Sequence, residues 1–353
     1  MAARATLAGV ATGTPKSGAG NVEMIRMLKM AMRQYRMWDA SFRPRIKGVP
    51  GDIAKPRLGL SAERFELLAA TVDSIYHSAA LVNFVYPYTT LKAPNVGGTK
   101  TLLELACLTR AKAFHHVSAV DVFVRGEDRT LYEADPLEPR DVPAGYIQSK
   151  WVAEKMVATV RDRGLPVTIY RPWIILGHSE HGSAHTTDYT CVFLKGCVQL
   201  GAAPDIPMTL NVMPADYVSR AIVHISRQPA GRGGIFHFAN PHAENLATVW
   251  DWVRGYGYDL ERMSYRDWHA RARTVSPDNA LFKILPILID GEEDLDTVSP
   301  ENFRPRIDTS HTDAVLAGSG ITCPPVSREL CDRVLDYLTD VDFLESPFDR
   351  SVL

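Results

Sequence analysis

The chain has 353 residues, 46% of them hydrophobic, so it can form one large domain or two moderate ones around a sizeable core. Its 39 Lys and Arg against 41 Asp and Glu argue against a nucleic-acid-binding protein, which concentrates basic residues on one face. The five cysteines form no CxxC pair, so the sequence predicts neither a disulfide framework nor a zinc site. No apolar run approaches the roughly 20 residues that span a bilayer, and the first residues do not resemble a secretion signal, so we expect a cytoplasmic protein without membrane contact.

The first half of the chain alternates apolar runs with helical patterns. Residues 22–38 predict an amphipathic helix with Met24, Leu28 and Tyr35 on one stripe. Strands are then expected at Ile46–Ile53, Ser74–Ala80, Phe114–Val120 and Val167–Ile175, with helices near 61–71, 89–110 and 145–163. This alternation is typical of βαβ crossovers and predicts an α/β fold, a doubly wound parallel sheet.

The periodicity weakens after about residue 177. Shorter helices are expected near 187–200, 215–227 and 246–254, with a brief strand at Ile235–Phe238. We therefore expect an atypical N-terminal segment (1–21), a Rossmann-like nucleotide-binding domain (22–176), and a smaller C-terminal substrate-binding portion (177–353), some elements of which return to the sheet.

Three residues suggest hydride chemistry at a carbonyl group. Tyr146 and Lys150 are four residues apart in a helical pattern, so their side chains share one face. Ser118 ends an apolar run, where a doubly wound sheet presents residues to its ligand. The phenol can donate a proton to a developing alkoxide, the serine can hold that oxygen, and the ammonium can lower the pKa of the phenol. The alternative is that the three residues have no catalytic role: the tyrosine packs on the sheet, the lysine is solvated, and the serine ends a strand.

Seven motifs in fixed order carry a more specific signal. They are GDI (51–53), DSIYHSAALVN (73–83), YTTLKAPNVGGTKTLLELA (88–106), HHVSAV (115–120), GYIQSKWVAEK (145–155), YRPWIILG (170–177) and NVMPADYVSRAIVHIS (211–226). Together they resemble the thioester reductase domains of nonribosomal peptide synthetases, polyketide synthases and carboxylic acid reductases, which are extended short-chain dehydrogenase/reductases. The resemblance covers roughly residues 22 to 340.

The resemblance implies a function in secondary-metabolite biosynthesis. Such domains use NADPH to reduce an acyl or peptidyl thioester on a phosphopantetheinylated carrier protein to an aldehyde, and sometimes on to an alcohol. It makes Ser118, Tyr146 and Lys150 the catalytic residues, and Lys150 also holds the nicotinamide ribose. The other cofactor-binding residues that it implies are Asp52 and Ile53 at the adenine, Ala79, Ala80 and Leu81 along the middle, and Pro172 beside the nicotinamide. Asn95 becomes a scaffold residue between helix and strand.

The family also begins with a strand and a GxxGxxG turn, which we do not find. Gly9, Gly13, Gly18 and Gly20 fit neither GxxGxxG nor GxGxxG, so the first βα unit is expected to be missing. Two hypotheses stay open: a reductase whose cofactor site is completed by residues 9–20 or by a partner, and a non-catalytic remnant that still binds a carrier protein. A further alternative is an extended reductase or epimerase that acts on a free small molecule.

Three histidines follow the predicted strand that ends near Ile175. His178, His181 and His185 lie in a polar loop without the fixed spacing of metal ligands, so we expect no metal site. The resemblance instead makes this loop a contact for the pantetheine arm. His115 and His116 precede Ser118 and are expected to be packed or hydrogen-bonded.

Overall fold

A computed structural model describes residues 21–123, 130–138, 144–289 and 306–347. The contacts within the chain divide it into two compact units. The first consists of residues 1–122, 136–171 and 228–235, and the second of residues 123–135, 172–227 and 236–353.

The first unit carries the central sheet and the helices beside it. Its helices are α1 (Asn21–Gln34), α2 (Ala62–Thr71), α3 (Tyr88–Leu91), α4 (Gly98–Cys107) and α5 (Gly145–Asp162). Shorter helical turns are η1 (Ala40–Arg45), η2 (Pro56–Gly59), η3 (Lys92–Gly97), η4 (Val120–Val122) and η5 (Pro229–Gly231), and η3 is a π-helical turn. Its strands are β1 (Ser74–His77), β2 (Ala113–Val117) and β4 (Val167–Pro172), whose last residue already belongs to the second unit.

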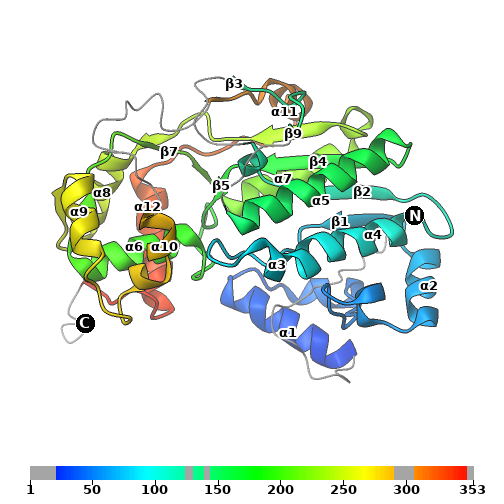
Figure 1. Cartoon of the computed structure of the whole chain (residues 1–353), viewed down its shortest axis with the longest axis horizontal. Helices are drawn as coiled ribbons and strands as arrows, with labels where there is room; N and C mark the ends of the chain where they lie inside the picture. The colour runs from blue at the N-terminus through cyan, green and yellow to red at the C-terminus, as the bar shows by residue number, and fades with distance from the viewer. Residues whose placement is uncertain (1–20, 124–129, 139–143, 290–305, 348–353) are drawn as a thin grey trace. The chain divides into compact units, whose positions relative to one another are not determined.

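The described strands form a four-stranded sheet in the order β1-β2-β4-β9, where β9 spans Ile235–Phe238 (Figure 1). β1 pairs with β2 and β2 with β4 in parallel. The backbone hydrogen bonds from Ile169 to Gly234 and from Trp173 to Phe238 advance together along β4 and β9, as they do between parallel strands. Because the strands point the same way, the carboxyl ends of β1, β2 and β4 share one edge of the sheet, where open α/β sheets bind ligands.

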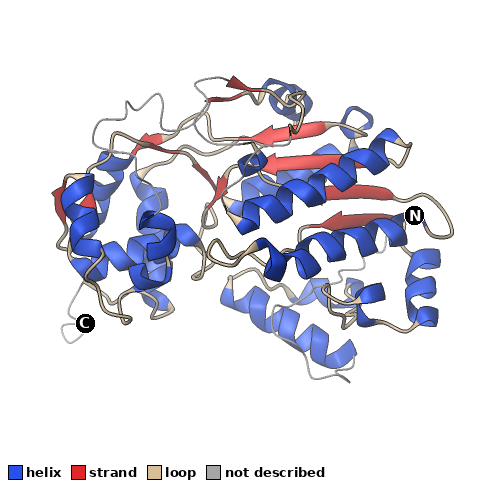
Figure 2. Ribbon diagram, in the orientation of Figure 1, coloured by secondary structure: helices blue, strands red, loops and turns tan. Residues whose placement is uncertain are grey.

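The core of the first unit lies between the sheet and two helices. Figure 2 shows α4 and α5 across one face of β1, β2 and β4. Leu103 and Leu105 of α4 and Val157 of α5 pack in one cluster with Phe114 and Ile169 of the sheet, and all five are buried. This apolar layer fixes α5 against the ends of the strands, and α5 carries the predicted catalytic pair.

The second unit is mainly helical. Its helices are α6 (Tyr189–Leu200), α7 (Ala215–Arg227), α8 (Leu246–Tyr256), α9 (Tyr265–Ala272), α10 (Leu285–Ile289), α11 (Ser310–Leu316) and α12 (Arg328–Asp340), with the helical turn η6 (Ala280–Lys283). Short strands pair two by two: β5 (Ile174–Ile175) with β8 (Val212–Met213), β6 (Ala202–Pro204) with β11 (Glu261–Met263), β7 (Thr209–Leu210) with β10 (Glu244–Asn245), and β3 (Thr130–Leu131) with β12 (Arg306–Ile307). Trp268 is fully buried in its core and donates a hydrogen bond from its indole to the carbonyl oxygen of Ala202.

The predicted alternation of strands and helices is confirmed, with two differences at the start of the chain. Ile46–Ile53 forms no strand, because Gly48, Pro50 and Gly51 interrupt the apolar run and Pro50 has no N–H for a strand ladder. The first helix also ends at Gln34 rather than near residue 38, since the backbone turns left-handed at Arg36, where φ is 57°. No described helix is both long enough and apolar enough to cross a bilayer.

Candidate active site

Ser118 lies directly after the last residue of β2, at the ligand-binding edge of the sheet. Its backbone N–H donates to the carbonyl oxygen of Tyr170 at 2.7 Å, which extends the pairing of β2 with β4 by one residue. Its side chain is 4% exposed, and its hydroxyl donates a hydrogen bond to the carboxylate of Glu154 in α5. The serine is therefore fixed through both its backbone and its side chain.

The face of α5 toward the sheet carries polar groups one turn apart. Tyr146, Lys150 and Glu154 are spaced four residues apart, so they stand above one another along the helix. Tyr146 is half-buried, whereas Lys150 and Glu154 are buried. The ammonium of Lys150 donates to the carbonyl oxygen of Val117 at 2.7 Å, so α5 is bonded to the carboxyl end of β2. The structure thus brings the predicted Lys150 beside the strand end that carries Ser118.

The start of α5 requires a glycine. A Cβ atom at Gly145 would lie 2.5 Å from the carbonyl oxygen of Tyr86 and 2.5 Å from the backbone nitrogen of Tyr88. The segment that follows β1 therefore packs directly on the first turn of α5. The ring of Phe84 from this segment meets the ring of Tyr146 edge-on, with 5.0 Å between their centroids. Close backbone approach and aromatic packing together set the position of the phenol.

Asn95 joins three elements of the site. Its side-chain oxygen accepts from the N–H of Leu81 at 2.7 Å, and its amide nitrogen donates to the carbonyl oxygen of Leu81 at 3.1 Å. The same nitrogen donates to the hydroxyl of Ser149 in α5 at 2.9 Å. Asn95 itself lies in the π-helical turn η3 and is 2% exposed. Asn95 thus joins α5 to the segment after β1, whereas the resemblance implied a contact with a strand.

The segment after β1 carries the three predicted residues for the middle of the cofactor. Ala79, Ala80 and Leu81 are half-buried and follow β1 at the ligand-binding edge of the sheet. The two alanines have small side chains, which leaves the backbone approachable there, and Asn95 holds the backbone of Leu81. Their cofactor-binding role stays a prediction.

Asp52 and Ile53 lie in the loop that replaces the expected strand. The carboxylate of Asp52 accepts from the N–H of Ala54 at 3.0 Å, so Asp52 forms a turn with its own side chain. Ile53 is buried against the start of α4, where a Cβ on Gly98 would lie 2.3 Å from its Cγ1 atom. Pro172, the last residue of β4, is buried. Contact of these three residues with a cofactor stays a prediction.

Burial shapes the charge at the site. It lowers the pKa of Lys150 to about 8, against the attraction of Glu154, which raises it. Burial, helped by the charge of Lys150, also lowers the pKa of His77 to about 3 and that of His116 well below its ordinary value. Both imidazoles are thus neutral at pH 7, and Lys150 is the cation at the end of β2.

The two predicted histidines of β2 are packed or hydrogen-bonded, as expected. His115 shares a hydrogen bond of 3.1 Å with the hydroxyl of Tyr170, and its ring stacks on that of Tyr76. His116 is fully buried beside the rings of Phe114 and His77.

Sequence reasoning missed two charged residues beside Ser118. Glu154 is 0% exposed and accepts on one carboxylate oxygen from Arg171 of β4, at 2.9 Å from Nε and 2.6 Å from Nη2. Arg171 is 2% exposed. Two signals in the sequence point to them: Glu154 continues the spacing of Tyr146 and Lys150, and Arg171 is a charge inside an apolar strand.

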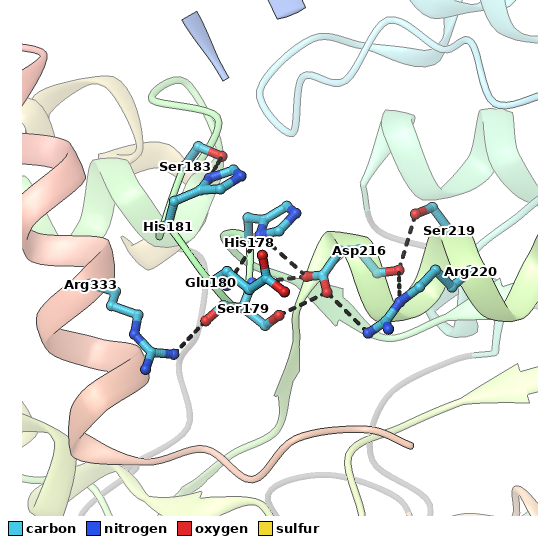
Figure 3. Close-up of polar contacts among 9 residues, drawn as sticks. All are labelled: His178, Ser179, Glu180, His181, Ser183, Asp216, Ser219, Arg220 and Arg333. Atoms are coloured by element: carbon cyan, nitrogen blue, oxygen red, sulfur yellow. Dashed lines mark hydrogen bonds and ion pairs between the residues drawn. The ribbon is translucent and has the colours of Figure 1, made fainter. Parts of the chain in front are cut away.

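The loop with the three predicted histidines belongs to the second unit and is held by α7 and α12 (Figure 3). Asp216 of α7 accepts from the N–H and the hydroxyl of Ser179, both at 2.8 Å, and Arg333 of α12 donates to the carbonyl oxygen of Ser179 at 2.6 Å. Burial alone would raise the pKa of Asp216, but the hydrogen bonds from Ser179 outweigh it and leave this pKa below its ordinary value. The rings of His178 and His181 stack with 3.7 Å between centroids.

The stacked pair does not form part of a metal cluster. The third histidine, His185, has its Nδ1 atom 3.0 Å from the hydroxyl of Thr187. Across the described ranges, no group of three or more His, Cys, Asp or Glu side chains could hold a metal ion.

The donor set around Lys150 fits one end of a nicotinamide dinucleotide. The buried ammonium has three N–H donors and gives one of them to the carbonyl oxygen of Val117. A bond from this ammonium to the ribose hydroxyls stays a prediction. The half-buried phenol of Tyr146 lies one helical turn away. The glycine-rich residues 9–20, which one hypothesis assigns to the cofactor site, lie outside the described residues.

Comparisons with known proteins show the family of this chain. A model of an NAD-binding family, described as male sterility protein, matches residues 19–222. The chain is similar to the solved terminal R domain of the myxalamid PKS-NRPS pathway, with 39% identity and a TM-score of 0.85, over 93% of this chain and 83% of that domain.

Two curated relatives are much longer proteins. A protein of the linear gramicidin synthase of Brevibacillus parabrevis is 36% identical over 328 residues, which make up 90% of this chain and 6% of that protein. L-2-aminoadipate reductase of Saccharomyces cerevisiae is 34% identical over 349 residues, 91% of this chain and 24% of the reductase. The chain therefore spans less than a quarter of the length of either relative.

Proposed function

Since this chain belongs to the NAD-binding family described as male sterility protein and, within it, to the terminal reductase domains, we propose that it reduces carrier-bound thioesters. Its cofactor is a nicotinamide dinucleotide, and we propose NADPH as the one it uses. The substrate is an acyl or peptidyl chain on the phosphopantetheine arm of a carrier protein, and the product is the aldehyde. The observation that carries this proposal is the position of Ser118 and Lys150 at the carboxyl end of β2, with Tyr146 on the same helix as Lys150.

The residues of α5 act on the carbonyl oxygen of the thioester. A nicotinamide held beside these residues would supply the hydride that the carbonyl carbon accepts. Negative charge then gathers on the carbonyl oxygen, and Tyr146 gives this oxygen its phenolic proton. Lys150 favours the ionised phenol through its positive charge, and Ser118 holds the oxygen.

Release of the product follows from the tetrahedral thiohemiacetal. The ionised Tyr146 takes the proton of the thiohemiacetal hydroxyl as the carbonyl double bond forms again. The carbon–sulfur bond breaks, and the pantetheine sulfur leaves as a thiolate that water protonates. The products are an aldehyde and the free thiol of the carrier arm, and Tyr146 regains its initial protonation state.

The test compares carrier-bound and free substrates. Purified chain is mixed with NADPH and one acyl chain in three forms: on a phosphopantetheinylated carrier protein, on free pantetheine, and as the free aldehyde. Consumption of NADPH is followed by absorbance, and the aldehyde is trapped and identified by mass spectrometry. We expect the carrier-bound thioester to be reduced, and Tyr146→Phe to lower kcat by about a hundredfold or more.

Two results would contradict the proposal in different ways. A chain that is folded by circular dichroism but binds no NADPH would favour the non-catalytic alternative. A chain that binds NADPH and reduces only free carbonyl compounds would favour the reductase of small molecules. Titration with NADH in parallel tests the choice of NADPH.

A further inference from the structure

The hydroxyl of Ser118 is held by a buried ion pair. One carboxylate oxygen of Glu154 accepts from Ser118, and the other accepts from Nε and Nη2 of Arg171. The exposed fractions of Ser118, Glu154 and Arg171 are 4%, 0% and 2%. The three side chains come from the end of β2, from α5 and from β4, so the network joins the elements that form the site.

Burial of such an ion pair is unfavourable because both ions lose their contacts with water, so its place beside Ser118 needs an explanation. Removing a carboxylate and a guanidinium from water is unfavourable for each ion, and their attraction offsets this only with good geometry and further hydrogen bonds. Here Arg171 donates from Nε and Nη2 to one carboxylate oxygen of Glu154, and Ser118 donates to the other. The hydrogen bond from Ser118 therefore stabilises the buried carboxylate, and the carboxylate gives the hydroxyl of Ser118 a fixed acceptor.

We infer that Glu154 is a positioning residue for Ser118, and that Arg171 holds the carboxylate of Glu154 in place for this purpose. A serine side chain has three staggered rotamers, and only a fixed one keeps its oxygen at a set place beside the reacting carbonyl. The anionic acceptor selects that rotamer before the substrate arrives. When negative charge develops on the carbonyl oxygen, the hydroxyl proton turns from Glu154 toward it while the oxygen of Ser118 stays in place. This inference rests on the proposed reduction.

Glu154 and Lys150 lie on the same helix and bond to different groups. Lys150 lies one turn earlier on α5 and bonds to the carbonyl oxygen of Val117, whereas Glu154 bonds to Ser118 and Arg171. Loss of Glu154 should therefore disturb the serine and leave the hydrogen bond of Lys150 to Val117 in place. It also removes the attraction that raises the pKa of Lys150, so the variants are compared at pH 6, where Lys150 keeps its charge. The rate of the chemical step should fall while the binding of NADPH stays.

A double-mutant cycle tests this reasoning. The variants Ser118→Ala, Glu154→Gln and the combination of both are assayed for thioester reduction. We expect Ser118→Ala to lower kcat by about a hundredfold, as for loss of one oxyanion donor, and Glu154→Gln by about tenfold. In the combined variant the second change should cost less than about twofold more, because Glu154 has no serine left to position. The KM and the Kd of NADPH should change by less than about twofold throughout.

Two further variants separate positioning from folding. Glu154→Gln removes the carboxylate that faces the buried charge of Arg171, so Glu154→Gln combined with Arg171→Gln is made as a neutral pair, for which we expect the same loss of kcat, about tenfold. The matched control is Thr168→Val in the same strand, which removes a buried hydrogen bond of 3.0 Å to the carbonyl oxygen of Gly231 and a bond to Tyr170, and leaves the bonds of Glu154 to Ser118 and Arg171 in place. It should lower the melting temperature and leave kcat unchanged for the folded chain.

The outcomes distinguish this inference from the proposed function. A wild-type chain that reduces no thioester would overturn both. An active wild type whose kcat is unchanged or higher in Glu154→Gln would overturn the positioning role alone. Full additivity of the two changes in the combined variant would do the same.

Discussion

Gly145 offers a test of how tightly the loop after β1 packs against α5. Alanine is a better helix former than glycine, which would stabilise the chain by at most about 1 kcal/mol. Its Cβ atom, however, would lie 2.5 Å from the carbonyl oxygen of Tyr86, 2.5 Å from the nitrogen of Tyr88 and 2.7 Å from the carbonyl carbon of Pro87. All three are backbone atoms, which cannot swing aside as the end of a side chain can.

The steric cost at Gly145 should therefore exceed the gain in helix propensity. Overpacking costs about 1–3 kcal/mol, and backbone contacts of this kind belong at the upper end. We expect Gly145→Ala to be destabilised by about 2 kcal/mol, which lowers the melting temperature by about 4–8 °C. Because Tyr146 is the next residue, its displacement should also lower kcat by about tenfold or more.

The matched control is Gly97→Ala. Gly97 also has helical backbone angles, with φ −62° and ψ −42°, but the nearest atom to an added Cβ is the carbonyl oxygen of Lys92 at 3.8 Å. This variant should gain up to about 1 kcal/mol. Urea unfolding followed by circular dichroism measures both changes. If Gly145→Ala is as stable as Gly97→Ala and keeps its kcat, the close approach that we infer is wrong.

Two further predictions concern the pH dependence and the scaffold of the site. The pKa of Lys150 lies near 8 in the folded chain, below its ordinary 10.5. Because Lys150 loses its charge there, kcat/KM should fall as the pH rises through 8. Burial of the charged lysine lowers the free energy of unfolding below pH 8, and this penalty should vanish as the pH rises from 8 to 10.5. Lys150→Arg keeps the charge, so a pH profile that still falls near 8 in this variant would assign the transition to another group. Asn95→Ala should leave the backbone groups of Leu81 without their partner and raise the Kd of NADPH about fivefold or more, as measured by fluorescence titration. Asn83→Ala, which removes only exposed bonds to Val85 and Tyr86, should leave the Kd within about twofold, and equal effects of the two variants would contradict the scaffold role of Asn95.

The helices of this protein could be predicted well because their apolar spacing is strong. The helix expected over 145–163 spans Gly145–Asp162, and the one expected over 215–227 spans Ala215–Arg227. Ile46–Ile53 was predicted wrongly, because an apolar run does not show whether it pairs with a neighbour. Its Gly48 and Pro50 were the signals against a strand.

The candidate site was predictable in its residue types and not in its contacts. Ser118, Tyr146 and Lys150 were predicted from their spacing and the place of Ser118 after a strand, together with the resemblance of the seven motifs to terminal reductases. The bond between Ser118 and Glu154 depends on how α5 lies on the sheet, which no local pattern contains. A glutamate inside a helix is usually solvated, and only the packing of α5 shows that Glu154 is buried.

The loop after β5 has consequences for how this protein could diversify. A Cβ on Gly182 would lie 1.9 Å from the carbonyl oxygen of Arg333, so the loop runs directly against the backbone of α12, while Ser179 is bonded to Asp216 of α7. A loop fixed at both elements does not tolerate inserted or deleted residues without disturbing two helices. Natural variation should therefore occur by exchange of single side chains such as His178 and His181, with the length of the loop kept constant among relatives that handle different acyl chains.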